Sequence, residues 1–198
     1  MLNNLQWFNE PKKWKILSES SLSMFVTPQT DFWRETHYGF TVDDGPFYYA
    51  KVGGEFEMEV KIIGDYRSRY DQMGLMIRKD EKCWIKTGIE YVDEKMNLSA
   101  VVTRDFSDWS VIELDHKPEA VWLKLIRRLN AGEIQYSLDK KTYKMMRLAY
   151  FPDKVAVEIG LNAASPDGDG FTALFEEFKI QHLPDLRRKK WLKENKEI

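Results

Sequence analysis

Residues 70–91 read YDQMGLMIRKDEKCWIKTGIEY, which describes two alternating strands joined by a short charged turn. Because successive side chains of a strand point to opposite faces, the hairpin has two different faces. The first face is aliphatic and carries Met73, Leu75, Ile77, Ile85 and Ile89. The second face carries Gln72, Gly74, Met76, Arg78, Trp84, Lys86, Gly88 and Glu90. An indole among hydrogen-bonding groups, with glycines that leave room above the sheet, predicts a sugar- or ligand-binding surface.

A period of two residues extends along most of the chain. Alternating segments occur at residues 55–63, 97–103, 110–114, 121–127, 134–138, 155–163 and 173–180. Turn signals recur at residues 43–46, 53–54, 79–82, 130–132, 139–141 and 166–170, at the spacing of an antiparallel meander. Residues 104–110, RDFSDWS, predict a tight loop that includes Trp109. Since no amphipathic helical period appears before the last residues, the sequence predicts an all-β fold.

The length of 198 residues suits a single sheet sandwich with a substantial core, because 43% of the residues are hydrophobic. We expect one domain over residues 1–183 and a basic C-terminal tail over residues 184–198 that forms a short helix or stays disordered. A solubilising extension is favoured over a nucleic-acid contact, because the basic run is short and the domain itself is not basic.

The charge balance excludes several classes of partner. A formal net charge of -2 gives no electrostatic reason to bind nucleic acid or a membrane surface.

The N-terminus has no apolar signal core, and no segment is long and apolar enough to cross a bilayer, so we expect a cytoplasmic protein. The sequence gives no indication of the oligomeric state.

The sequence predicts neither a metal site nor a cofactor. The single cysteine, Cys83, excludes an internal disulfide and a zinc site built on cysteines, and it has no neighbouring His that would activate it. His37, His116 and His182 lack the spacing of metal ligands. Residues 165–170, SPDGDG, resemble half of a calcium loop without the remaining ligands, and a glycine-rich turn accounts for them.

Carboxylates could support glycosidase chemistry, which needs two acids that flank a sugar bond. Glu55, Glu57 and Glu59 share one strand face, and their surroundings predict a solvated outer face rather than a sheltered cleft. Glu90 differs because it shares its face with Trp84 and Lys86. It is the one candidate for a catalytic acid, although an ion pair with Lys86 explains the same pattern.

Several motifs together resemble a family of unknown function that includes the yeast regulator of enolase. The motifs are DFWRETHYG at 31–39, YDQMGLMIR at 70–78, CWIKTGIEY at 83–91, LSAVVTRDFSDWS at 98–110, YSLDKKTYKMMRL at 136–148 and SPDGDGF at 165–171. The resemblance implies a concanavalin A-like lectin/glucanase jelly roll, in which two antiparallel sheets form one concave face. Similar sandwich modules occur attached to β-xylosidases, but the family has no established reaction, and fold alone does not confer activity.

The resemblance also suggests which residues form a site. The matching motif residues are Asp71, Gln72, Trp84, Lys86, Glu90, Ser99, Asp108, Trp109, Ser110 and Arg147. One departure is Asp139-Lys140-Lys141, where the family pattern usually has an Asp-Gly turn. The glucanase motif of two Glu flanking an Asp on one strand is not matched.

Three functional hypotheses remain open. The leading one is a non-catalytic or regulatory module that binds a carbohydrate or polar metabolite on the concave face, stacked on Trp84 and Trp109. Its ligand-binding residues would be Asp71, Gln72, Trp84, Lys86, Glu90, Ser99, Trp109 and Arg147. The second is a sugar-acting hydrolase or isomerase that uses Glu90. The third is a protein-interaction domain that regulates metabolism through a protein partner.

Overall fold

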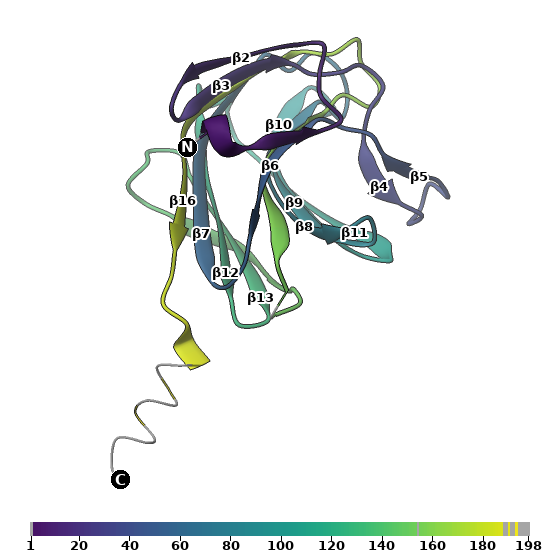
Figure 1. Cartoon of the computed structure of the whole chain (residues 1–198). Helices are drawn as coiled ribbons and strands as arrows, with labels where there is room; N and C mark the ends of the chain where they lie inside the picture. The colour runs from purple at the N-terminus through teal and green to yellow at the C-terminus, as the bar shows by residue number, and fades with distance from the viewer. Residues whose placement is uncertain (1, 154, 188–189, 191–192, 194–198) are drawn as a thin grey trace.

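The fold is a sandwich of two large antiparallel sheets (Figure 1). The computed structural model describes residues 2–153, 155–187, 190 and 193. In spatial order the first sheet contains β1 (Gln6–Phe8), β6 (Phe47–Val52), β15 (Val157–Ala164), β8 (Gln72–Asp80), β9 (Cys83–Val92), β10 (Lys95–Arg104) and β11 (Phe106–Glu113). The second contains β14 (Lys144–Tyr150), β13 (Ala131–Ser137), β12 (Val121–Arg128), β7 (Phe56–Gly64), β16 (Thr172–His182), β3 (Ser21–Phe25) and β2 (Lys13–Ser18). The all-β, two-sheet prediction is confirmed.

Two smaller elements complete the described fold. A short 3-10 turn, η1 (Leu2–Asn4), precedes β1. A separate hairpin, formed by β4 (Phe32–Arg34) and β5 (Thr41–Asp43), pairs only with itself. In Figure 1 this β4–β5 hairpin stands at the side of the sandwich, close to β8, β9 and β11.

The hairpin of residues 70–91 forms as predicted, with β8 paired to β9. Gln72 lies opposite Glu90 and Gly74 lies opposite Gly88, so the polar residues of both strands share one face. The two glycines do more than leave space above the sheet. A Cβ on either would lie 1.9 Å from a carbonyl oxygen of the partner strand, so the close approach of the two backbones requires glycine at both positions.

The main core lies between the two sheets and follows from the alternation of the strands. On β7 the inward residues Phe56, Met58, Val60 and Ile62 are fully buried. They meet the aliphatic face of the hairpin, where Leu75 and Ile77 are buried as well. This face of each sheet is thereby removed from water, which is the main source of stability of a sandwich.

The opposite, polar face of the first sheet is partly covered rather than open. A second apolar cluster forms there between that sheet and the β4–β5 hairpin, and it consists of Phe32, Trp33, Phe47, Met76, Trp84 and Val101. Arg78 on β8 donates two hydrogen bonds of 2.6 Å to the carboxylate of Asp43 on β5. The hairpin is therefore fixed over the sheet by both apolar contacts and a bidentate ion pair.

Other sequence predictions need correction. Residues 104–110 do not form a tight loop, because Asp105 alone, with a φ of 63°, joins β10 to β11, and Trp109 lies within β11 opposite Val101. Asp adopts this left-handed conformation more readily than most residues. Strands β1 to β6 and β14 were not predicted. Three of them, β1, β4 and β5, have only three residues, which is too short for alternation to show.

A solvated outer face was predicted for Glu55, Glu57 and Glu59. This prediction is wrong for Glu59, which lies on β7, and for Glu55, which comes just before that strand. Both are buried. Glu59 accepts a hydrogen bond from Tyr143 Oη at 2.7 Å and lies 2.8 Å from Lys179 Nζ and 3.5 Å from Lys124 Nζ. Glu55 accepts a hydrogen bond of 3.0 Å from the Leu129 backbone N–H. Lysine side chains of neighbouring strands cover Glu59, and Arg128 and the Leu129 backbone hold Glu55, which a period-two pattern does not reveal.

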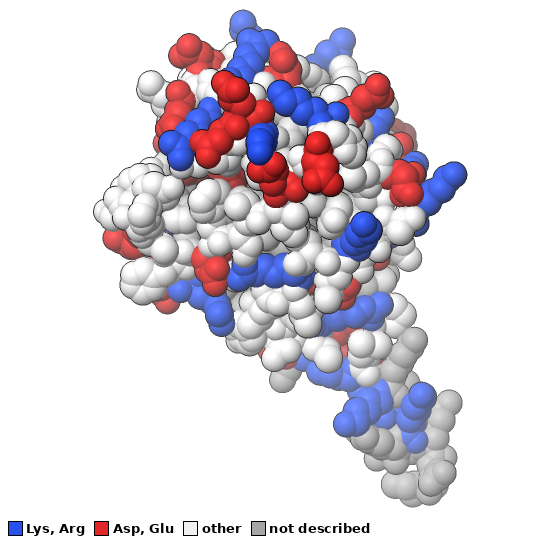
Figure 2. All heavy atoms as spheres, turned by 180° about the vertical axis from the view of Figure 1, so that it is seen from behind, with Lys and Arg blue, Asp and Glu red and all other residues white. Residues whose placement is uncertain are grey.

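After β16 the chain leaves the sandwich, and Leu186 and Arg187 adopt helical conformation. Most of the predicted tail, at residues 188–189, 191–192 and 194–198, lies outside the described residues. Within the described part of the chain, no helix is long and apolar enough to span a membrane. Seen from behind, acidic and basic side chains are interleaved over the upper half of the molecule, as the balanced net charge leads one to expect (Figure 2).

Candidate functional site

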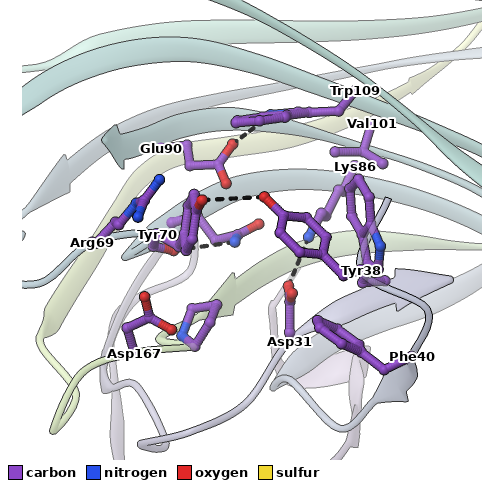
Figure 3. Close-up of a pocket in the computed structure, with 13 residues that line it drawn as sticks. Asp31, Tyr38, Phe40, Arg69, Tyr70, Lys86, Glu90, Val101, Trp109 and Asp167 are labelled. Atoms are coloured by element: carbon purple, nitrogen blue, oxygen red, sulfur yellow. Dashed lines mark hydrogen bonds and ion pairs between the residues drawn. The ribbon is translucent and has the colours of Figure 1, made fainter. Parts of the chain in front are cut away.

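A cavity of about 270 Å³ opens between the polar face of the first sheet and the β4–β5 hairpin (Figure 3). Strands β8 to β11 supply its floor, and the loops at residues 35–40, 65–71 and 165–170 supply its walls. Its aromatic lining consists of Trp33, Tyr38, Phe40, Tyr70 and Trp109. Its charged lining consists of Asp31, Arg69, Lys86, Glu90 and Asp167. Convergent polar groups in an aromatic concavity are typical of a small-molecule site.

Lys86 occupies the middle of the floor and is neutralised by Asp31. Lys86 Nζ lies 3.0 Å from Asp31 Oδ1, and both side chains are largely removed from solvent. The ammonium group also lies 5.8 Å from the ring centroid of Trp84. The ion pair joins β9 to the segment before β4, so it both closes one side of the cavity and balances the lysine charge.

Glu90 is the most deeply placed acid of the cavity. Its Oε2 atom accepts hydrogen bonds from Ser99 Oγ at 2.7 Å and from Trp109 Nε1 at 2.8 Å. Burial raises the pKa of the Glu90 carboxyl above 4.5, and the nearby Lys86 charge and the two hydrogen bonds only partly oppose this. Among the described residues, no side chain donates a hydrogen bond to the other oxygen, Oε1.

Two tyrosines stand at the wall of the cavity (Figure 3). The hydroxyl oxygens of Tyr38 and Tyr70 are 3.2 Å apart, which links the β4–β5 loop to the loop before β8. Burial and the hydrogen bond with Tyr38 raise the pKa of Tyr70 to about 12, so the Tyr70 hydroxyl remains a protonated donor at neutral pH. The backbone of Tyr70 has a φ of 66°, and its carbonyl accepts a hydrogen bond from Gln72 Nε2 at 3.1 Å.

Of the residues predicted from the sequence, four line the cavity, namely Gln72, Lys86, Glu90 and Trp109. Ser99 lies behind Glu90 and orients its carboxylate. Asp71 is fully buried and fixes the loop before β8, where it accepts hydrogen bonds from the backbone N–H groups of Arg67 and Ser68 and from Ser165 Oγ. The structure thus brings together the residues of the 70–91 hairpin but gives Asp71 a structural position.

Trp84 and Arg147 lie away from the cavity. Trp84 is 1% exposed and packs edge-on against Phe32, with ring centroids 6.4 Å apart, so no ring face is free to stack on a ligand. Arg147 lies on β14 of the other sheet, where it pairs with Asp108 at 3.2 Å and hydrogen-bonds Ser110. It therefore joins the edge strands of the two sheets. The alternation of side chains assigned Trp84 to the correct face of the sheet, but it could not show that β4 covers this residue.

The sequence reasoning did not assign the residues that complete the walls. These are Asp31, Trp33, Tyr38, Phe40, Arg69, Tyr70 and Asp167. A signal was present, because residues 31–40 combine two acidic side chains, four Phe, Trp or Tyr rings and a glycine in a segment that has no strand period. In the part of the chain that the structure describes, no group of three or more His, Cys, Asp or Glu side chains could hold a metal ion.

Comparisons with known proteins agree with this fold. A family model described as "Protein of unknown function (DUF1349)" matches residues 7–183. "Regulation of enolase protein 1" of Saccharomyces cerevisiae is 38% identical over 175 residues, which are 88% of this chain and 87% of the yeast protein. The crystal structure of a functionally unknown protein from Saccharomyces cerevisiae superimposes with a TM-score of 0.87 at 36% identity, and the match covers 92% of this chain and 98% of that one.

A more distant match extends the similarity of fold to lectins. The legume lectin-like domain from Entamoeba histolytica superimposes with a TM-score of 0.59 at 13% identity, and the match covers 92% of each chain. At this identity the match shows the fold alone, and it confirms the lectin-like sandwich that the motifs led us to expect. With the family model over residues 7–183 and the yeast relative over most of both chains, this chain belongs to the DUF1349 family.

Proposed function

We propose that this protein is a binding module that holds a small polar ligand, in the first place a carbohydrate unit, in the cavity beneath the β4–β5 hairpin. The observation that most supports this binding role is that five aromatic and five charged side chains line one cavity of about 270 Å³. Aromatic rings offer flat surfaces to the apolar faces of a sugar ring, while fixed polar groups hydrogen-bond its hydroxyls.

The polar groups of the cavity suit a ligand with several hydroxyls. Glu90 Oε1 is available as an acceptor, and the hydroxyls of Tyr38 and Tyr70 can donate or accept. Gln72 Nε2 and the Lys86–Asp31 pair add donors and acceptors that are held in place by their own partners. In this proposal Trp109 keeps the stacking role that the sequence suggested for it, and the two tyrosines replace Trp84 in that role.

The relatives are compatible with a binding role. The lectin-like domain of Entamoeba histolytica shares the sandwich fold, and the name of the yeast relative refers to regulation of enolase. A module that binds a metabolite without transforming it can serve a regulatory role of that kind. The fold alone carries no activity, so the cavity residues bear the proposal.

Isothermal titration of the protein with a panel of neutral mono- and disaccharides tests the proposal. Tyr38→Ala removes one wall of the cavity at a residue that is already 43% exposed, so the fold should survive the change. We expect this variant to lose about tenfold or more in affinity for any sugar that the wild type binds. Tyr150→Ala is the matched control, because Tyr150 is 50% exposed on β14, outside the cavity.

The proposal fails if no sugar in the panel binds at millimolar concentration. It also fails if Tyr38→Ala and Tyr150→Ala weaken binding equally, because the ligand would then not occupy this cavity. Circular dichroism spectra of both variants establish that each is folded before its affinity is compared.

A sugar-acting hydrolase is the second candidate, and one observation favours it. Three carboxylates, those of Asp31, Glu90 and Asp167, line the same cavity, and burial raises the pKa of Glu90. A protonated Glu90 is suited to act as a general acid, while a second, ionised carboxylate serves as nucleophile or base. Incubation with a panel of aryl glycosides tests this function. Turnover that Glu90→Gln abolishes would support it, and the absence of turnover with every glycoside would exclude it for those substrates.

A further inference from the structure

We infer that the cavity selects a ligand that carries an ammonium group, such as an amino sugar, over the neutral and the acidic sugar of the same shape. This inference rests on the proposed function and narrows its ligand class. It follows from three features of the cavity: the charge that remains after internal pairing, an open oxygen on Glu90, and rings that surround the space at different angles.

The charges inside the cavity leave an excess of one acid. Lys86 and Asp31 neutralise each other at 3.0 Å, so neither charge is free to attract a ligand. Glu90 has no direct ion pair with any described residue, so the nearby Lys86 charge compensates its carboxylate only in part. A ligand ammonium supplies the counter-charge that the protein does not, whereas a ligand carboxylate would face Glu90 with the same sign.

The rim of the cavity does not reverse this balance. Arg69 is exposed, its guanidinium lies 4.6 Å from the ring centroid of Tyr70, and it faces Asp93 at 3.9 Å. Asp167 also lies near Tyr70 and forms no direct ion pair with the described residues (Figure 3). The route into the cavity therefore also passes an acid that is free to attract a cation.

Glu90 is placed to receive that cation directly. The residue is 6% exposed, and both hydrogen bonds from the protein go to Oε2. Oε1 is thus the atom of a buried carboxylate that is left to a ligand, and Figure 3 shows it directed toward the space between Tyr70 and Tyr38. A charged donor makes a shorter and stronger hydrogen bond to such an oxygen than a neutral hydroxyl does.

The aromatic walls of the cavity add to the attraction for a cation. Trp33 and Tyr38 meet edge-on at 5.5 Å with their planes 72° apart, and Tyr70 and Trp109 meet edge-on at 6.3 Å with their planes 76° apart. The electron-rich face of an aromatic ring attracts a cation, so rings that border the cavity favour a ligand ammonium there. Neutral sugars gain only the stacking contribution from the same rings.

Titration calorimetry with three probes of one ring shape tests the inference: D-glucosamine, D-glucose and D-glucuronate. At pH near 7 we expect glucosamine to bind about tenfold tighter than glucose, with glucuronate the weakest of the three. Glu90→Gln should bring the ratio of glucosamine to glucose affinity toward one. Glu113→Gln, at an exposed carboxylate that pairs with Lys95 outside the cavity, should leave that ratio unchanged.

The dependence on pH gives a second readout. Several groups face the space around Glu90. Lys86 lies on the floor and Asp31 at one side, Ser99 and Trp109 donate to the carboxylate, and Tyr38, Tyr70, Arg69 and Asp167 line the walls and the mouth. Because burial favours the protonated form of Glu90, an ammonium ligand that prefers the carboxylate should displace its proton. Glucosamine affinity should therefore fall relative to glucose affinity when the pH is lowered from about 7 to about 5.

The outcomes separate the inference from the proposed function. Equal affinity for glucosamine and glucose, or tighter binding of glucuronate, overturns the selection for an ammonium group while sugar binding stands. A preference for glucosamine that Glu90→Gln leaves intact also overturns it, because Glu90 would not be the partner of the cation. If none of the three probes binds and no neutral sugar binds either, the inference and the proposed function fall together.

Discussion

Glu59 and Glu90 are two glutamates of similarly low exposure, 5% and 6%, on opposite sheets, yet Glu90 lies deeper in the protein and their partners differ in kind. Burial alone would raise the pKa of Glu59, but hydrogen bonds from Lys179 and Tyr143 and the charge of Lys124 outweigh it and lower the pKa below 4.5. At Glu90 burial prevails over Lys86 and two neutral donors, and the pKa rises above 4.5.

The difference separates a structural carboxylate from a candidate site. The acceptor capacity of Glu59 is used by side chains of β14, β12 and β16 or their adjoining turns, which fastens the strands of the second sheet to one another. Glu90 keeps one oxygen free toward a cavity and lacks a direct counter-charge among the described residues. Low exposure of an acid therefore says little by itself, and its depth in the protein together with its partners indicates its role.

The largest expected effect is a loss of stability on substitution of Glu59, the structural carboxylate of the pair. Glu59→Ala should lower the free energy of unfolding by about 3 kcal/mol, because Lys124, Lys179 and the Tyr143 hydroxyl lose their shared acceptor. Urea denaturation followed by circular dichroism measures the change.

Glu57→Ala is the control for that experiment. Glu57 lies on the same strand and contacts Lys124 at 3.4 Å, but it is less buried and has one such partner. We expect a loss below about 1 kcal/mol. Equal losses at both positions would show that the partners of Glu59 do not set it apart.

Much of the fold could be predicted from the sequence, for a physical reason that the two sheets share. Strands β7 to β10 are nine or ten residues long, and their alternation is long enough to identify both the strand and its buried face. The β4–β5 hairpin escaped prediction because its position depends on contacts between distant residues. Arg78 binds Asp43 across 35 positions of sequence, and Lys86 binds Asp31 across 55.

The difference between alternation within a strand and contacts between distant residues also explains which site residues were predicted. The alternation of side chains along each strand showed that Gln72, Lys86 and Glu90 share a face, and all three line the cavity. This alternation cannot show what lies above a face of the sheet, so it did not reveal that Phe32 covers Trp84. It also could not distinguish Glu59 from an exposed glutamate, because the lysines that surround Glu59 come from other strands.

Opposite dependence on pH is the next test of the comparison. The folded-state pKa of Glu59 is depressed, so its contribution to stability is present above pH 4.5 and is lost as the pH falls through the folded value. The folded-state pKa of Glu90 is raised, so its protonated form favours the folded state below pH 4.5, and this contribution is lost as the pH rises through the folded value.

Each contribution is measured as the unfolding free energy of the wild type minus that of the Glu→Gln variant, over a range of pH. On acidification the difference should fall for Glu59 and rise for Glu90. If both differences move in the same direction, the assignment of opposite environments to the two carboxylates is incorrect.

A smaller effect is expected from a matched pair of tyrosines. Tyr143→Phe removes the 2.7 Å hydrogen bond to Glu59 and should cost about 1 kcal/mol in thermal or urea unfolding. Tyr38→Phe removes a longer, exposed contact between two hydroxyls at 3.2 Å and should cost less than about 0.5 kcal/mol. A larger loss at Tyr38 than at Tyr143 would indicate that the wall of the cavity has a stabilising role of its own.

The smallest expected effect concerns Glu90 itself. Glu90→Gln should change the free energy of unfolding by less than about 1 kcal/mol at neutral pH, because the amide oxygen can still accept from Ser99 and Trp109. The sign should be toward greater stability, since the substitution removes a charge that burial disfavours and that no direct ion pair compensates. A loss as large as that of Glu59→Ala would show that Glu90 is another structural carboxylate. A neutral or positive change means that stability does not account for a glutamate at this position, which leaves the cavity that its free oxygen faces as the reason for it.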